Sequence, residues 1–123
     1  MSKSKTIDDL RYGDVIRLNL YPTEDGEQAS YRLAAILSHP VKQNKILSGR
    51  VSVAPIAKAA REFPLHVDLD LRTTTQGSIL MEYMRMIDLG SYEYEYIESL
   101  PVDKMYECGN IFEGIYEEML TMD

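Results

Sequence analysis

Short stretches in which apolar and polar residues alternate run through most of the chain. The clearest is residues 65–72, where Leu, Val, Leu and Leu alternate with His, Asp, Asp and Arg. A period of two is that of a β-strand with one buried face and one face in water. Similar patterns predict further strands at residues 16–20, 33–37, 51–54, 78–88 and 92–96.

The last part of the chain has a helical period instead. After Pro101, apolar residues recur at spacings of three and four, which places them on one face of a helix. They are Met105, Cys108, Phe112, Ile115, Met119 and Met122. Several short strands followed by one helix predict a mainly β fold, either a small, strongly curved barrel or a two-sheet fold, with the helix packed on its outside.

The length and composition fit one domain. The chain has 123 residues, 45% of them hydrophobic, and we place a single domain at residues 11–123 after a loose polar segment at residues 1–10. No apolar run approaches the ~20 residues of a membrane span, and the first residues lack the apolar core of a secretory signal. The single cysteine, Cys108, cannot form an internal disulfide and is interpreted as a small core residue. We therefore expect a cytoplasmic protein.

Charge is divided unevenly along the chain. The net charge is −7, but residues 1–62 carry ten Lys and Arg against seven Asp and Glu, whereas residues 63–123 carry three against thirteen. A protein that binds phosphates needs only a local basic surface. The overall acidity therefore does not exclude a nucleic-acid partner, and the first half of the chain is where such a surface is expected.

A set of short motifs follows the order of a known family. The motifs are Gly13-Asp14-Val15, Tyr21-Pro22-Thr23, Glu27-Gln28, Arg32 with Ala34-Ala35-Ile36-Leu37-Ser38, Val53-Ala54-Pro55-Ile56, Phe63-Pro64-Leu65-His66-Val67, and Glu82-Tyr83-Met84-Arg85-Met86-Ile87-Asp88. Together they resemble the MazF/PemK family of toxin ribonucleases over roughly residues 11–120. The resemblance implies a Src-homology-type barrel of short antiparallel strands with a C-terminal helix, and a homodimer. It also implies a metal-independent endoribonuclease that cleaves single-stranded RNA and is neutralised by a small antitoxin.

The chemistry of such a cleavage needs no cofactor, and none is expected. The 2′-hydroxyl of the RNA attacks the neighbouring phosphorus, so the protein must stabilise the phosphorane charge, remove one proton and supply another. Arg32 is the natural ligand for that charge because its fork matches two phosphate oxygens and stays ionised. The resemblance implies that Arg32 is catalytic. The alternative is that Arg32 caps a strand or pairs with Asp25 or Glu27. His39 and His66 stand apart from other ligand types, which argues against a metal site.

The sequence departs from the family pattern at Asp25-Gly26, where the family usually has glycine-serine, at Leu33, where it usually has proline, and at residue 57. The last departure bears on the chemistry. The family usually places a threonine or serine directly after the proline-isoleucine pair, where its hydroxyl assists at the phosphate, but this chain has Ala57. Losing one such donor typically costs about 10²–10³ in rate. Either another group substitutes, with Ser52, Lys58 and His66 as candidates, or activity is attenuated. His66 is the preferred second catalytic residue because imidazole titrates near neutrality. The alternative is that His66 has no catalytic role and is simply a strand residue on the face exposed to water.

The remaining candidate substrate contacts are mostly charged. They are Glu27, Gln28, Lys42, Lys45, Lys58 and Arg85. Two functions from different classes remain open. The first is an attenuated toxin ribonuclease. The second is a non-catalytic, toxin-like barrel that captures an antitoxin or inhibits a nucleic-acid enzyme.

Overall fold

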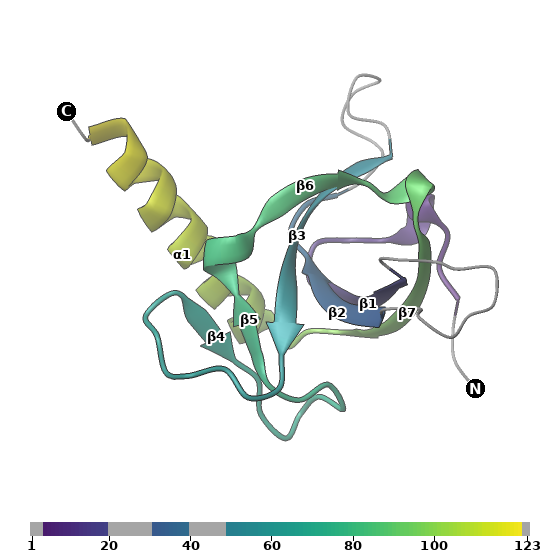
Figure 1. The fold of residues 1–123 in the computed structure, drawn as a ribbon, viewed down its shortest axis with the longest axis horizontal. Coiled ribbons are helices and arrows are strands. Elements are labelled where there is room, and N and C mark those ends of the chain that lie inside the picture. The colour runs from purple at the N-terminus through teal and green to yellow at the C-terminus, as the bar shows by residue number, and fades with distance from the viewer. Residues whose placement is uncertain (1–3, 20–30, 40–48, 122–123) are drawn as a thin grey trace.

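The computed structural model describes residues 4–19, 31–39 and 49–121, and it contains seven strands and one α-helix in these ranges. The strands are β1 (Asp14–Asn19), β2 (Tyr31–Ile36), β3 (Arg50–Ala57), β4 (His66–Asp68), β5 (Ser78–Leu80), β6 (Arg85–Asp88) and β7 (Glu93–Ser99). The helix is α1 (Val102–Thr121), and three 3₁₀ turns are η1 (Ile7–Asp9), η2 (Met81–Tyr83) and η3 (Leu89–Ser91). Figure 1 shows a strongly curved arrangement of strands, with α1 at one side.

All strand pairs are antiparallel, and β3 is the strand around which the sheet is built. The order is β4-β5-β3-β2-β1-β7, and β6 also pairs with β3. The first half of β3 pairs with β6 and its last two residues pair with β5. Among the described residues no pairing joins β7 to β4 or β6, so the strongly curved sheet stays open. The predicted mainly antiparallel β fold with a C-terminal helix is confirmed, and the strands form one open sheet.

The two faces of the sheet bury two separate clusters, as strand alternation requires. The first cluster contains Ile16, Leu18, Ala34, Ile36, Val51 and Val53, and Leu10, Ile87 and Leu89 complete it. The second contains Val15, Ala35, Ala54, Val67, Ile79, Met81, Leu100 and Cys108. Cys108 is 1% exposed and belongs to α1, so the helix covers the second cluster.

The single long strand predicted at residues 78–88 is broken in two. The structure replaces its middle with η2, which lies between β5 and β6. Ile79 and Met81 pack into the second cluster, whereas Ile87 packs into the first. In one continuous strand these three residues would share a face, so the turn is what lets β5 and β6 face different clusters. Gly77 precedes β5 at a φ of +117°, and a side chain there would collide with the Ala57 backbone. The chain therefore enters β5 in close contact with the end of β3.

Residues 4–10, expected to be loose, are held against the sheet. Asp14 is 2% exposed, and its carboxylate accepts hydrogen bonds from Lys5 Nζ at 3.0 Å and from Ser99 Oγ at 2.8 Å. The hydroxyl of Tyr94 donates to the Lys5 carbonyl at 2.9 Å. A buried carboxylate needs such donors, and here they fasten the N-terminal segment to β1 and β7.

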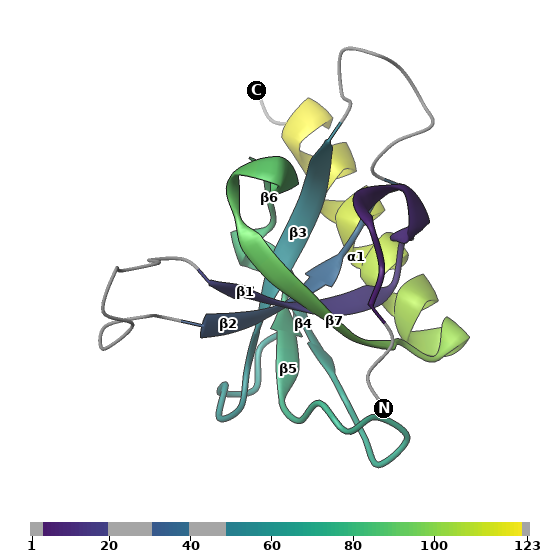
Figure 2. The same ribbon diagram turned by 90° about the vertical axis from the view of Figure 1, so that its right-hand side faces the viewer.

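Helix α1 extends beyond the sheet that it covers. Its first turns pack on the second cluster through Met105, Cys108 and Ile111. Farther along, Phe112 is 45% exposed although the spacing predicted it on the buried stripe. Figure 1 shows why, since the second half of α1 projects away from the strands, and in the view of Figure 2 the helix lies behind them.

Candidate nucleic-acid site

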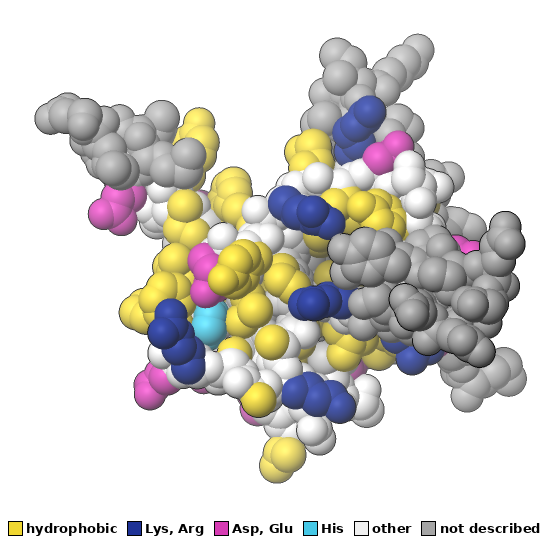
Figure 3. Space-filling view, viewed as in Figure 1, with side chains coloured by type: hydrophobic (Ala, Val, Ile, Leu, Met, Phe, Trp, Pro, Cys, Tyr) yellow, Lys and Arg dark blue, Asp and Glu magenta, His cyan; other side chains and the backbone are white. Residues whose placement is uncertain are grey.

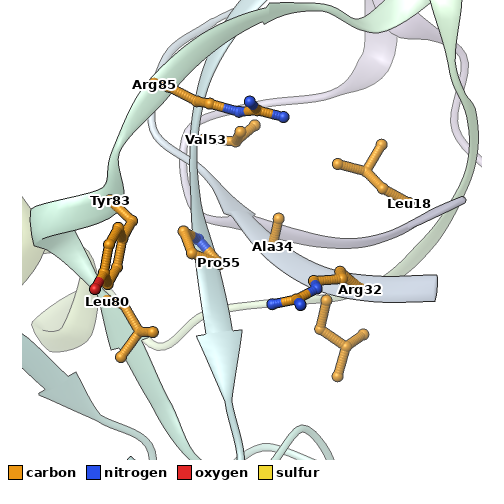
Figure 4. Close-up of a pocket in the computed structure, with 9 residues that line it drawn as sticks. Leu18, Arg32, Ala34, Val53, Pro55, Leu80, Tyr83 and Arg85 are labelled. Atoms are coloured by element: carbon orange, nitrogen blue, oxygen red, sulfur yellow. The ribbon is translucent and has the colours of Figure 1, made fainter. Parts of the chain in front are cut away.

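A cavity of about 580 Å³ lies where β1, β2, β3, β5, η2 and β6 meet. Its lining residues are Leu18, Arg32, Leu33, Ala34, Val53, Pro55, Leu80, Tyr83 and Arg85. Figure 4 shows the guanidinium groups of Arg32 and Arg85 on different sides of an apolar floor that includes Val53, Ala34 and Pro55. Two cations therefore flank one hollow whose floor is apolar.

Strand register explains why these two arginines share a cavity. Arg32 lies opposite Leu18 in the β1–β2 pair, and Arg85 lies opposite Val53 in the β3–β6 pair. Opposite residues in an antiparallel pair point to the same face. Leu18 and Val53 both belong to the first cluster, so Arg32 and Arg85 both project at its rim. Within the described ranges no carboxylate forms an ion pair with either guanidinium.

On the surface around this cavity, basic side chains alternate with hydrophobic ones. Figure 3 shows separate Lys and Arg side chains down the middle of the face, with hydrophobic side chains between them and at their left. Arg32 and Arg85 are both exposed, so their charges face solvent and can reach a ligand. Among the described residues that line the cavity, none carries a negative charge.

Ala57 is the last residue of β3, one step beyond the final residue pair of the β2–β3 ladder. That pair joins Leu33 to Ile56, and continuing its register puts Ala57 across from Arg32, although Ala57 does not line the cavity. Ala57 offers only a methyl group at that point. On the other side of Ala57, its paired residue on β5 is Ser78. The Ser78 hydroxyl donates a hydrogen bond to Asp68 Oδ1 at 2.6 Å and is therefore already engaged.

His66 does not line the Arg32 cavity. It lines a different hollow, of about 370 Å³, between β4 and α1, together with Lys104, Glu107 and other residues. Its Nε2 lies 2.8 Å from Glu82 Oε2 and its Nδ1 lies 2.9 Å from the Arg61 carbonyl oxygen. Both ring nitrogens are therefore occupied by contacts within the protein.

The other candidates for the missing hydroxyl, Ser52 and Lys58, also do not line the Arg32 cavity. Ser52 pairs with Met86 and lies on the opposite face of β3 from Val53. Lys58 lines a third hollow of about 440 Å³, which it shares with Arg17, Thr74 and Thr75. The structure thus places Arg32 and Arg85 around one cavity, whereas His66 and Lys58 line other hollows.

The loop beside Lys58 is held by Glu98 of β7. Its carboxylate accepts hydrogen bonds from Thr75 Oγ1 at 2.6 Å, Thr75 N at 2.7 Å, Thr74 Oγ1 at 2.8 Å and Thr74 N at 3.1 Å. Burial opposes ionisation of this carboxylate, but the hydrogen bonds from Thr75 and Thr74 outweigh it. The pKa of Glu98 is consequently lowered below its usual value. Thr74 and Thr75, which line the same hollow as Lys58, are therefore held in place by Glu98.

Four candidate residues lie outside the described residues, namely Glu27, Gln28, Lys42 and Lys45. Conversely, the structure shows that Tyr83 lines the Arg32 cavity. The sequence alone predicts only that Tyr83 lies within a long strand and assigns it no function. A tyrosine between an acidic residue and a methionine gives no signal of its own. Its place in the cavity depends on the η2 turn.

Metal-ligating residues do not cluster in the part of the chain that the structure describes, where no group of three or more His, Cys, Asp or Glu could hold a metal ion. Among the same residues, no helix has the length and apolar content needed to cross a membrane.

Comparisons with known proteins decide the family. A model of the PemK-like, MazF-like toxins of type II toxin-antitoxin systems matches residues 11–114. The chain belongs to this family. Its open sheet and C-terminal helix are thus a MazF/PemK fold, and the cavity between Arg32 and Arg85 is a feature of a toxin-family chain.

Solved structures of MazF have the same fold. MazF from Deinococcus radiodurans matches with a TM-score of 0.71 and 23% identity, over 88% of this chain and 96% of that one. A MazE-MazF structure from the same organism matches with a TM-score of 0.70 and 24% identity, over 93% of this chain and 97% of that one. A comparison with curated proteins gave no match.

Proposed function

We propose that this protein is a toxin ribonuclease that binds single-stranded RNA at the cavity between Arg32 and Arg85. The observation that carries the proposal is the placement of two guanidinium groups around one cavity in a chain of the MazF/PemK family. Guanidinium forks bind phosphate oxygens in pairs and stay charged at every physiological pH. The cavity is therefore suited to an RNA backbone with one phosphate at its rim.

The proposed reaction uses the RNA's own 2′-hydroxyl as nucleophile. Its oxygen attacks the adjacent phosphorus, the bond to the 5′-oxygen breaks, and the products are a 2′,3′-cyclic phosphate and a 5′-hydroxyl. Arg32 and Arg85 stabilise the negative charge that develops on the phosphorane. One proton must leave the 2′-hydroxyl and one must reach the departing 5′-oxygen, and among the described residues that line the cavity no imidazole or carboxylate is present for these transfers. Cleavage should consequently be slow.

The absence of a hydroxyl beside Arg32 supports the same expectation. Ala57 presents a methyl group there, and one lost transition-state hydrogen bond typically lowers a rate by about 10²–10³. His66 is the residue first considered as a substitute. We infer that His66 instead holds η2 in place through Glu82 and acts as a positioning residue.

An antitoxin and a second copy of the chain are the proposed protein partners. The solved structures with the same fold include complexes of MazE with MazF. A small antitoxin laid across the cavity would shield Arg32 and Arg85 from RNA. A homodimer is supported by exposed large apolar side chains, among them Met86 at 54% and Tyr116 at 55%.

The test is incubation of the purified protein with a long unstructured RNA in EDTA. Wild type should cleave and leave cyclic phosphate ends, whereas Arg32→Ala and Arg85→Ala should each lose activity. Arg61→Ala is the matched control, because Arg61 is an exposed arginine that lies over Phe63, 5.5 Å from the ring, and does not line the cavity. Loss of activity in the control but not in the cavity variants would contradict the proposal.

The salt dependence of binding gives a second readout. Each phosphate contact releases counterions, so the slope of log Kd against log salt should fall by about one for each cavity arginine removed. If RNA binds with this Arg32 dependence but is never cleaved, the alternative of a non-catalytic binding module is correct. The methyl group of Ala57 beside Arg32 is the observation that favours that alternative.

A further inference from the structure

We propose that Tyr83 is a stacking platform for one unpaired nucleobase, next to the phosphate held by Arg32 and Arg85. The inference rests on the proposed function, because it specifies how the same cavity receives RNA. It adds a recognition element that reads an exposed base face, and it limits the substrate to strands in which that face is free.

The exposure of Tyr83 is the first observation. Its side chain lines the cavity and yet the residue is 63% exposed. Figure 4 shows the ring on the opposite side of Pro55 from Arg32, with Arg85 on the next strand above it. A large ring left open to solvent at a basic cavity is available to a ligand, and bases stack on such rings irrespective of their sequence.

The turn that carries Tyr83 is anchored on both sides, which fixes the ring's backbone in advance. Met81, two residues earlier, is 1% exposed in the second cluster. The adjacent residue is Glu82, whose Oε2 lies 2.8 Å from His66 Nε2. The Met84 amide donates a hydrogen bond to the Met81 carbonyl oxygen at 3.2 Å. Because the backbone is held, only the two side-chain torsions of Tyr83 need to be ordered on binding, and that lowers the entropic cost.

The chemistry of the cavity floor is the second observation. A site for phosphate alone needs donors and charge, whereas this floor is apolar between its two arginines. Leu80 and Pro55 lie beside Tyr83. Their apolar side chains could contact the edge of a nucleobase that stacks on Tyr83. At about 580 Å³ the cavity lies within the range of about 300–1,000 Å³ that small ligands occupy. A nucleotide would match both parts of the lining, with its phosphate at the two arginines and its base at the apolar residues.

This arrangement selects single strands. In a duplex the bases are stacked on each other and paired, so none can lie on Tyr83 without being unstacked first. Stacking strength grows with ring area, so purines should bind more tightly than pyrimidines at this position. The ligand class is therefore an unpaired nucleotide within an RNA strand.

The experiment measures binding without cleavage. A short fluorescent RNA with 2′-O-methyl groups cannot supply the attacking hydroxyl, and its anisotropy gives Kd for wild type, Tyr83→Phe and Tyr83→Leu. We expect Tyr83→Phe to bind as wild type does and Tyr83→Leu to bind about tenfold or more weakly. Tyr106→Leu is the matched control, since Tyr106 is 70% exposed on α1 and does not line the cavity.

Abasic oligonucleotides locate the stacked base. Moving one abasic site along the RNA should weaken wild-type binding at one position, and at that position Tyr83→Leu should cause no further loss. Light scattering of each variant without RNA checks that Tyr83→Leu leaves the molecular mass unchanged. A change in mass together with the loss of binding would overturn the proposal, because Tyr83 would then act at a protein interface.

Failure of this inference differs from failure of the proposed function. If wild type binds RNA through Arg32 and Tyr83→Leu binds equally well, the stacking role is refuted while the RNA site stands. If neither wild type nor any variant binds RNA, the proposed function and the stacking role fall together. If Tyr83→Phe loses as much affinity as Tyr83→Leu, the hydroxyl acts rather than the ring, and stacking is again refuted.

Discussion

His66 Nε2 lies 2.8 Å from Glu82 Oε2, and this contact ties β4 to the η2 turn. The imidazole side chain is only 6% exposed, and its other nitrogen lies 2.9 Å from the Arg61 carbonyl oxygen. A side chain with both nitrogens engaged holds its neighbours in place. Its position also links the histidine to the cavity indirectly, because η2 carries Tyr83.

We expect His66→Ala to destabilise the protein rather than to abolish its chemistry. Removing the imidazole leaves the Glu82 carboxylate without this partner, which should lower the free energy of unfolding by roughly 1–3 kcal/mol. Urea unfolding of wild type, His66→Ala and His66→Gln measures the change. If His66→Ala kept full stability but lost all cleavage, together with the low-pH limb of its rate profile, a catalytic base would be the better interpretation.

Cys108 should be inert in the native protein. Its side chain is 1% exposed, and burial, with a further contribution from Glu107, raises the pKa of the thiol to about 11. Because the thiolate is the reactive form, labelling by a disulfide reagent at pH 8 should be about 100-fold or more slower than in denaturant. Absorbance of the released thiolate follows the reaction. Fast labelling of folded protein would mean that α1 opens readily from the second cluster.

Glu98 should make stability depend on pH in the acid range. Burial raises its pKa and the bonds from Thr75 and Thr74 lower it, with a net decrease. A carboxyl with a lowered folded-state pKa stabilises fully above its unfolded value of about 4.3, and this contribution is lost as pH falls through the folded value. Glu98→Gln should therefore cost roughly 1–2 kcal/mol near pH 7 and progressively less below pH 4.

Urea titrations across pH measure the difference between wild type and Glu98→Gln. Glu113→Gln is the control, because Glu113 is exposed on α1 and its substitution changes the net charge by the same amount. A difference that stayed constant from pH 7 to pH 3 would mean that the hydrogen bonds act independently of the Glu98 charge.

Much of this fold could be predicted from alternation alone. Where a strand has one buried face, as at Ile16 and Leu18, the period of two shows directly in the sequence. The prediction failed at residues 78–88, where η2 interrupts the strand and Ile79 and Ile87 face different clusters. It also failed at Leu71, which alternates like a strand residue but is fully exposed in a turn where Arg72 bonds Asp70 and Asp103. Long-range contacts of this kind leave no local pattern.

The candidate site was predictable only in part, for the same reason. Arg32 could be found because its family motif is local in sequence. That Arg85 shares its cavity and that His66 does not depends on the registers of β3 with β6 and of β4 with β5. The acid-base chemistry of imidazole makes His66 a natural candidate in the sequence, but the fold places His66 in a different hollow from Arg32.

The exposed end of α1 predicts how the chain dimerises. Phe112 and Tyr116 are 45% and 55% exposed, and their rings stack with centroids 6.3 Å apart. Exposed apolar surfaces of this kind usually mark interfaces. We expect light scattering to give about twice the chain mass of 14.1 kDa, and Phe112→Ser with Tyr116→Ser to shift the protein toward monomer. Val102→Ser is the control, because Val102 is 63% exposed at the start of α1. A wild-type monomer at micromolar concentration would contradict this.

Ala57→Thr should increase RNA cleavage. Continuing the β2–β3 register one step past Leu33 and Ile56 puts residue 57 across from Arg32, where a hydroxyl could donate to the phosphate that Arg32 is proposed to hold. One added transition-state hydrogen bond should raise the cleavage rate about tenfold or more. A β-branched residue is favoured in a strand, and Ala57 is only half-buried, so the substitution should fold.

Ala57→Val is the matched control for Ala57→Thr, because valine has the shape of threonine without its hydroxyl. Single-turnover cleavage of one RNA by wild type and both variants separates the contributions: only threonine should accelerate the reaction. Equal rates in all three proteins, with strong wild-type cleavage, would mean that another residue already supplies the proton or hydrogen bond. If none of the three cleaves while RNA still binds through Arg32, the catalytic site has been lost and the chain is a binding module.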